Sequence, residues 1–198
     1  SPYPCSSHVQ AGPADALNMA DRSAWLELTR EAVLEPELPI CDSHHHLWDY
    51  PDNRYLVDEF LRDVHGGFGG DSGAGPGGGH KVVSSVFVEC QQFYRTEGPL
   101  ELRPVGETEF VDSVAGVYPA PGGKTDVPAG QVNVAAGIVG FADLALGAAV
   151  QPVLEAHMAV SKRFRGVRHA SAWDASEQVH NAHTKPVWNL LQTADFRQ

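Results

Sequence analysis

Short apolar segments that alternate with helical patterns constrain this chain more than any other feature of its sequence. The clearest segment, KVVSSVFVE at 81–89, is apolar and β-branched, as a buried strand requires. Near-continuous apolar strands that alternate with helices predict an α/β fold with a parallel sheet covered by helices on both sides. The strands are expected at 40–41, 81–89, 136–143 and 164–169, and the helical segments at 106–117, 147–160 and 187–194.

Polar side chains gather at the point where each expected strand ends. Parallel crossovers are right-handed, so such a sheet either opens into a doubly wound fold or curls into a barrel. In both cases the carboxyl ends of the strands form the edge where ligands bind. We therefore expect a functional site at this edge, formed by Asp42–His46, Glu89–Gln92, Asp143 and Arg168–His169.

The 198 residues divide into an N-terminal arm with a helix, residues 1–38, and a sheet-forming region, residues 39–198. The helix of the arm is expected at Ser23–Leu34. Residues 66–79 are rich in glycine and predict a loop that is either a lid over the catalytic edge or a disordered insertion. The loop contains one G-x-G-x-x-G pattern. We exclude a dinucleotide site there, because the pattern precedes a strand instead of following one.

Charge, hydropathy and cysteine content argue against several classes of partner and site. The chain has 25 acidic and 14 basic residues, a formal net charge of −11, which disfavours nucleic acid because phosphate binding needs clustered Lys and Arg. No apolar run is long enough to suggest a membrane span. Three cysteines without a CxxC pair predict neither a disulfide framework nor a Cys-type zinc site, and no secretory signal pattern opens the sequence. We expect a cytoplasmic protein with a small-molecule partner.

The most informative string is the run from Asp42 to His46. Alternate side chains of a strand point the same way, so His44 and His46 project to one side, with Asp42 in phase and His45 opposite. Two imidazoles at the mouth of a sheet are suited to sharing one divalent metal ion, here zinc or manganese. The alternative is a polar strand end with solvated histidines.

Three more residues at the same edge are candidates for catalytic roles. Glu89 either ligates the metal or orients a ligand histidine, or else it forms a salt bridge with a neighbouring arginine. Arg168 either clamps a substrate carboxylate or forms a structural ion pair with a strand-end acid. His169 faces away from Arg168, because adjacent strand residues point to opposite sides. An exposed arginine in an acidic chain predicts an anionic substrate.

The run ICDSHHHLWD at 40–49 resembles the opening strand of the amidohydrolase superfamily, in particular the amidohydrolase-related branch that includes sugar lactonases and pyrone-dicarboxylate lactonase. The segments at 86–90, 164–169 and 189–198 are similar to later parts of that family, so the resemblance covers residues 39–198. It implies a (β/α)8 barrel of the TIM type. This chain corresponds to the first half of that barrel, about four strands.

By this resemblance, His44 and His46 match the first pair of metal ligands. The implied activity is that of a metal-dependent hydrolase of a lactone or a related cyclic carboxylated small molecule. Some relatives decarboxylate instead, so a non-oxidative decarboxylase is the second hypothesis. The family's later metal ligands and its general base have no counterpart before Gln198. A third hypothesis is therefore a non-catalytic half-barrel that needs a second copy, a partner chain or a missing C-terminal half.

Overall fold

The computed structural model describes residues 34–35, 37–51, 53–64, 80–119, 131–176, 178–179 and 188–197. The expected helix at 23–34, apart from its last residue, and the glycine-rich segment at 66–79 lie outside this part of the chain. The strands are β1 (Pro39–His45), β2 (Trp48–Tyr50), β3 (Asn53–Tyr55), β4 (Lys81–Val88), β5 (Gly116–Pro119), β6 (Gln131–Gly140) and β7 (Phe164–Val167). The α-helices are α2 (Val57–Val64), α3 (Val105–Val114) and α4 (Gln151–Val160). Short 3-10 turns are η1 (Leu100–Leu102), η3 (Leu144–Val150), η4 (Leu190–Gln192) and η5 (Asp195–Arg197).

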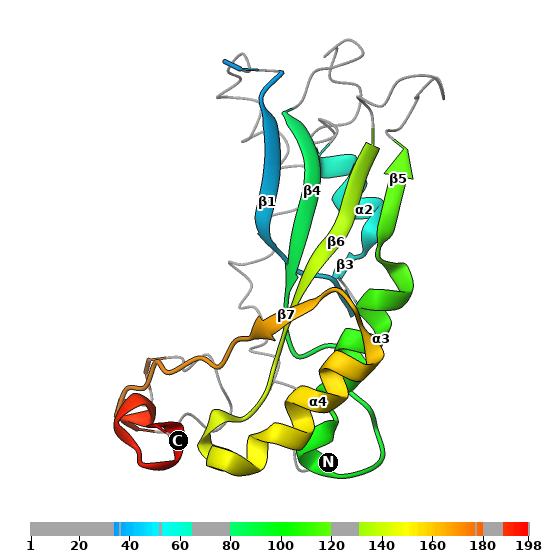
Figure 1. Ribbon diagram of the computed structural model, residues 1–198. Coiled ribbons are helices and arrows are strands. Elements are labelled where there is room, and N and C mark those ends of the chain that lie inside the picture. The colour runs from blue at the N-terminus through cyan, green and yellow to red at the C-terminus, as the bar shows by residue number, and fades with distance from the viewer. Residues whose placement is uncertain are drawn as a thin grey trace.

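The expected α/β fold with a mostly parallel sheet is confirmed. The main sheet has five strands in the order β1-β4-β6-β5, and β7 also pairs with β6 (Figure 1). The pairs β1–β4, β4–β6 and β6–β7 are parallel, so the four expected strands lie side by side in chain order. Their carboxyl ends therefore share one edge of the sheet. A separate hairpin joins β2 and β3.

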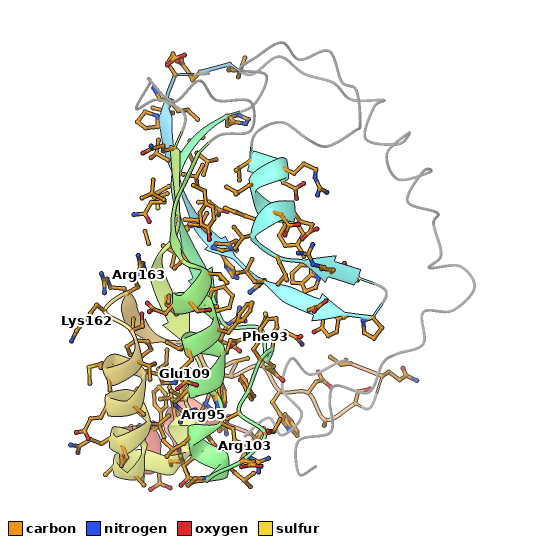
Figure 2. The ribbon with its side chains drawn as sticks, turned by 90° about the vertical axis from the view of Figure 1, so that its right-hand side faces the viewer. Phe93, Arg95, Arg103, Glu109, Lys162 and Arg163 are labelled. Atoms are coloured by element: carbon orange, nitrogen blue, oxygen red, sulfur yellow. The ribbon has the colours of Figure 1, made fainter. Side chains whose placement is uncertain are left out.

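The sheet carries its helices on one face, so the prediction of helices on both faces is wrong for the described residues. Phe60 of α2 and Val111 of α3 pack in the same core cluster as Ile138 of β6. A Cβ on Gly140, two residues further along β6 and on the same face, would meet His157 of α4 at 2.9 Å. All three α-helices thus cover this face, and both views place α2 on one side of the sheet (Figures 1 and 2).

Three strands were not anticipated, namely β2 and β3 of the separate hairpin and β5 of the main sheet. The helix expected at 106–117 ends at Val114 as α3, and Gly116–Pro119 then turns back as β5, antiparallel to the start of β6. The hydroxyl of Tyr118 donates a hydrogen bond to the carbonyl of Val114 at 2.5 Å and holds this reversal. The chain breaks its helix here because extended pairing with β6 satisfies the backbone of these β-favouring residues.

The other boundaries differ from expectation by a few residues. β1 continues through Asp42–His45 because its backbone stays paired with β4, so these polar residues belong to the strand itself. β6 begins and ends earlier than the predicted 136–143. The helix predicted at 147–160 is split into η3 and α4, since Gly147 adopts a φ of 56°, which interrupts a right-handed helix. The last helical turn is two short 3-10 turns instead.

The apolar core lies between the sheet and the helices. Its buried members come from β4, β6, α2 and α3 and from the segment after β1. They are Leu47, Phe60, Phe87, Val111, Val132, Val134, Ala135 and Ile138. This layer holds the strands rigidly and leaves their carboxyl ends accessible for polar side chains.

Candidate functional site

His44 and His46 meet at the end of β1, as their spacing predicts. Their Nε2 atoms lie 3.2 Å apart, and the two rings are nearly perpendicular. The Nδ1 atom of His46 is 2.7 Å from the carbonyl oxygen of Val88, at the end of β4. A carbonyl only accepts, so His46 Nδ1 carries the proton and His46 Nε2 presents its lone pair in the neutral ring. The neighbouring strand thus fixes the tautomer of His46 that binds metals.

The pair is suited to two positions on one metal ion. Two imidazole nitrogens on a tetrahedral ion at about 2.0–2.1 Å lie roughly 3.3 Å apart, close to the observed Nε2 separation. Burial lowers the pKa of His46, with His44 and Arg168 acting in the same direction, so His46 is kept in its neutral, ligating form. Among the described residues no group of three or more His, Cys, Asp or Glu side chains converges on a metal position. The described residues therefore offer only these two candidate ligands.

Glu89 and Arg168 form an ion pair beside the histidines. Arg168 Nε donates to Glu89 Oε1 at 2.9 Å, and Arg168 Nη2 donates to the backbone carbonyl of Glu89 at 2.6 Å. The Glu89 side chain is 3% exposed, whereas that of Arg168 is 40% exposed. The buried carboxylate of Glu89 therefore holds the guanidinium of Arg168 in one orientation. This contact is the salt bridge with a neighbouring arginine that the sequence left open as the alternative role of Glu89. The remaining N–H groups of Arg168 are the part accessible to a ligand.

His169 has a different environment from the other candidates. Its Nδ1 accepts the backbone N–H of Leu144 at 3.0 Å, and its ring makes an edge contact with Phe141. Burial lowers the pKa of His169, so the ring is neutral and its Nδ1 lone pair is available for this bond. Asp143 reinforces the same turn, because its carboxylate caps η3 at the N–H of Ala145. His169 thus positions the loop after β6 and does not join the histidine pair.

Sequence reasoning missed Glu107, the buried carboxyl group in the first turn of α3. Its Oε1 accepts the backbone N–H groups of Cys90 and Gln92 at 3.0 and 2.8 Å. The side chain is almost completely buried, and this burial raises the pKa of Glu107 to about 8. An acidic residue in a first helical turn is ordinary, so no signal in the sequence distinguished it.

The loop that Glu107 holds follows β4 directly and lies at the functional edge. Two of its non-glycine residues, Gln91 and Phe93, have positive φ values of 64° and 55°. Phe93 stacks on Phe110, and Arg95 forms an ion pair with Glu109 of α3 (Figure 2). These contacts fix the loop in a conformation that its sequence does not favour.

Two other histidines have contrasting surroundings. His157 is completely buried, and its ring nitrogens lie 2.8 Å from Thr108 Oγ1 and 3.0 Å from the carbonyl oxygen of Phe141. His157 is therefore a core histidine whose two ring nitrogens both have a hydrogen-bond partner. His45 points away from His44 and His46, as alternation requires, and stacks on Phe60. Neither ring nitrogen of His45 has a hydrogen-bond partner among the described residues.

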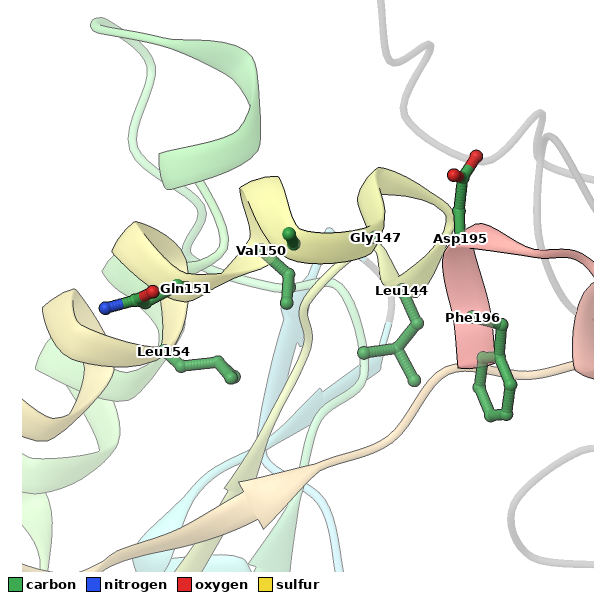
Figure 3. Close-up of a pocket in the computed structure, with 8 residues that line it drawn as sticks. Leu144, Gly147, Val150, Gln151, Leu154, Asp195 and Phe196 are labelled. Atoms are coloured by element: carbon green, nitrogen blue, oxygen red, sulfur yellow. The ribbon is translucent and has the colours of Figure 1, made fainter. Parts of the chain in front are cut away.

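Two cavities lie near the described strand ends. One, of about 470 Å³, runs along η3 and α4 and is bordered by η5, with Leu144 and Leu154 among its apolar lining (Figure 3). Asp195 is its only ionisable residue among those described. The other, of about 420 Å³, borders the histidine triplet of β1. The second cavity therefore adjoins the candidate site, whereas the first resembles a packing gap between helical turns.

Comparisons with known proteins add no family to this geometry. No family model, no curated protein and no solved structure matches the chain. None of the described helices has the length and apolar character that crossing a membrane requires. The functional argument consequently depends on the side chains at the strand ends.

Proposed function

We propose that this chain is a metal-dependent hydrolase that opens a lactone or a related cyclic carboxylated small molecule. The observation that carries the proposal is the 3.2 Å separation of the His44 and His46 Nε2 atoms, with the His46 tautomer fixed by Val88. The resemblance of residues 40–49 to the first strand of the amidohydrolase superfamily supports the same reading. When bound, a divalent ion polarises an ester carbonyl and lowers the pKa of a water molecule.

The protein's own residues hold the reactants. His44 and His46 would hold the ion through their Nε2 atoms, and the carbonyl of Val88 keeps His46 from rotating. The exposed edge of Arg168 binds the carboxylate of the substrate, while Glu89 holds the guanidinium in one orientation. With the ion held by the histidines and the substrate carboxylate held by Arg168, the reacting carbonyl would be positioned beside the ion, and this positioning accelerates the reaction.

The fold is consistent with the first half of a (β/α)8 barrel. β1, β4, β6 and β7 are parallel neighbours in chain order, and the described α-helices cover one face. A doubly wound sheet reverses its strand order and places helices on both faces. A barrel instead keeps the chain order and places all its helices outside, so the observed arrangement favours the barrel.

Metal analysis of the whole protein tests the assignment. After loading with zinc or manganese and removal of free ion, we expect His44→Ala and His46→Ala to lose bound metal, each by at least tenfold in affinity. His80→Ala is the matched control, because His80 lies at the opposite end of β4 and is exposed. Equal metal content in all three variants would remove the assignment.

A product assay separates hydrolysis from decarboxylation. Hydrolysis of a lactone in H₂18O incorporates one labelled oxygen into the product and releases no CO₂. In the same assay, Arg168→Met should raise KM more than it lowers kcat, because the arginine binds the substrate in the ground state as well as in the transition state. Release of CO₂ without labelled oxygen in the product would identify the decarboxylase instead.

A further inference from the structure

Two consecutive peptide groups at the end of β4 hold two side chains of the candidate site. The carbonyl of Val88 accepts from His46 Nδ1 at 2.7 Å, and the carbonyl of Glu89 accepts from Arg168 Nη2 at 2.6 Å. The carbonyl of one residue and the N–H of the next belong to one planar peptide group, so a partner that fixes the N–H also fixes the direction of the carbonyl. The partners of these two N–H groups therefore decide how the two side chains are held.

The two N–H groups are held in different ways. The N–H of Glu89 donates to the carbonyl of Val139 in β6 at 2.8 Å, as expected beside a parallel neighbour. The N–H of Cys90 lies beyond the paired part of the sheet and donates instead to Glu107 Oε1 at 3.0 Å. A side chain of α3 thus takes the place of a neighbouring strand for the peptide group between Glu89 and Cys90.

The loop depends on this support because its backbone has an unfavourable conformation. Gln91 and Phe93 have positive φ values of 64° and 55°, which residues with a Cβ seldom adopt unless their surroundings hold them. Glu107 Oε1 also accepts the N–H of Gln92 at 2.8 Å, so one oxygen holds the backbone on both sides of Gln91. Without this acceptor the loop is free to relax, and the peptide group before Cys90 turns with it.

We propose that Glu107 is a positioning residue for Arg168. It acts through the peptide group between Glu89 and Cys90, whose N–H it holds and whose carbonyl holds the guanidinium. The Glu89 side chain adds the bond to Arg168 Nε at 2.9 Å, so both contacts come from the residue directly before the held N–H. The role of Arg168 as a clamp for a substrate carboxylate rests on the proposed function, whereas its orientation by Glu107 does not.

Proton exchange at the Arg168 side chain tests this role without a substrate. In the 15N-labelled full chain, the Nε–H resonance of Arg168 is identified by its absence in Arg168→Met. Its exchange with solvent is followed at pH 6, where Glu107 is protonated because burial raises its pKa to about 8. Glutamine and methionine are similar in size to this side chain, but only glutamine offers a carbonyl oxygen. We expect Glu107→Met to speed the exchange about tenfold, as loss of one hydrogen bond predicts, and Glu107→Gln to preserve the wild-type rate.

A backbone N–H in the core of the sheet separates this effect from a loss of stability. The N–H of Ile138 donates to the carbonyl of Arg163 at 2.9 Å and its residue is completely buried, so it exchanges only when the fold opens. We expect Glu107→Met to speed exchange at Arg168 by a larger factor than at Ile138. Exchange that rises at Ile138 by the same factor or more would show that Glu107 is merely structural and would overturn the proposal.

Two other variants complete the test. Glu109→Met on the same helix removes the ion pair with Arg95 of the same loop but keeps the bond to the Cys90 N–H, so exchange at Arg168 should stay at the wild-type rate. If Glu107→Met does not fold, Glu107→Asp decides, since its shorter side chain does not reach both N–H groups and should also speed the exchange. Equal exchange at Arg168 in Glu107→Gln and in the variant that lacks or withdraws the acceptor overturns the proposal.

Failure of the hydrolase proposal would be visible separately. Absence of metal binding or of turnover would remove the hydrolase and leave the exchange at Arg168 as predicted. Where a carboxylated lactone is turned over, Glu107→Met should raise its KM, and it should raise KM no further in the Arg168→Met background. A further rise of KM in that background would show that Glu107 does not act through Arg168.

Discussion

Replacement of Glu107 by glutamine should change how the stability of this protein depends on pH. The buried carboxyl group has its pKa raised from 4.5 to about 8, mainly by burial and also by the charge of Glu89. Its Oε2 has no hydrogen-bond partner in the described part of the chain. Glutamine keeps a carbonyl oxygen for the N–H groups of Cys90 and Gln92 and stays neutral at every pH. The variant therefore imitates the protonated form of Glu107.

The direction follows from proton binding. Between about pH 4.5 and pH 8 the folded state holds a proton on Glu107 that the unfolded state has released. The stabilising contribution of Glu107 is thus complete below pH 4.5 and is lost as the pH rises through about 8. The full loss is on the order of 5 kcal/mol, a large part of the 5–15 kcal/mol typical of a folded domain.

Urea unfolding of the wild type and Glu107→Gln between pH 5 and pH 9 measures the effect. We expect the variant to gain stability relative to the wild type as the pH rises to about 8, and the difference to level off above that pH. Taking the difference removes the contribution of buried histidines such as His157, whose pKa is lowered by burial and which destabilises the fold at acidic pH. Glu109→Gln is the control on the same helix, since Glu109 is partly exposed and paired with Arg95. A constant difference between wild type and Glu107→Gln across this range would refute the reasoning.

Two further predictions concern packing and charge near the same edge. In thermal unfolding, Gly106→Ala should destabilise the protein by about 3 kcal/mol or more, because the added Cβ would lie 2.6 Å from backbone atoms of the loop after β4. The control Gly166→Ala should be nearly neutral in the same measurement, because open space surrounds Gly166. Arg168→Met should cost about 2–3 kcal/mol in urea unfolding by leaving Glu89 buried and unpaired, and Arg168→Met combined with Glu89→Gln should recover most of it. Failure of the double variant to recover would mean that Arg168 stabilises by packing alone.

The strands were predictable because their signal is local. The segment at 81–89 contains four valines and a phenylalanine in nine residues, and β4 spans nearly the same residues. The spacing of His44 and His46 likewise decides which side of the strand they share, and the structure places them together. α2 was overlooked although its acidic first turn, with Asp58 and Glu59, carries a recognisable start signal.

The parts that escaped prediction depend on partners that are distant in sequence. β5 exists because Gly116–Pro119 pairs with β6, and a helical pattern before it does not reveal that pairing. The sequence likewise left open whether Glu89 acts at the metal site or forms a salt bridge, because its partner Arg168 is 79 positions away along the chain. Only the fold brings such groups within hydrogen-bond distance, and burial then decides their protonation.

The charges beside the histidine pair decide how the proposed substrate would be held. Beside His46, Glu89 offsets part of the positive charge of Arg168, so the proposed anionic substrate would be held by the exposed edge of one guanidinium and would need the charge of a metal ion for tight binding. Since side chains alternate across a strand, a shift of β1 by one residue would turn the His44 and His46 side chains away from Val88 and abolish the proposed site.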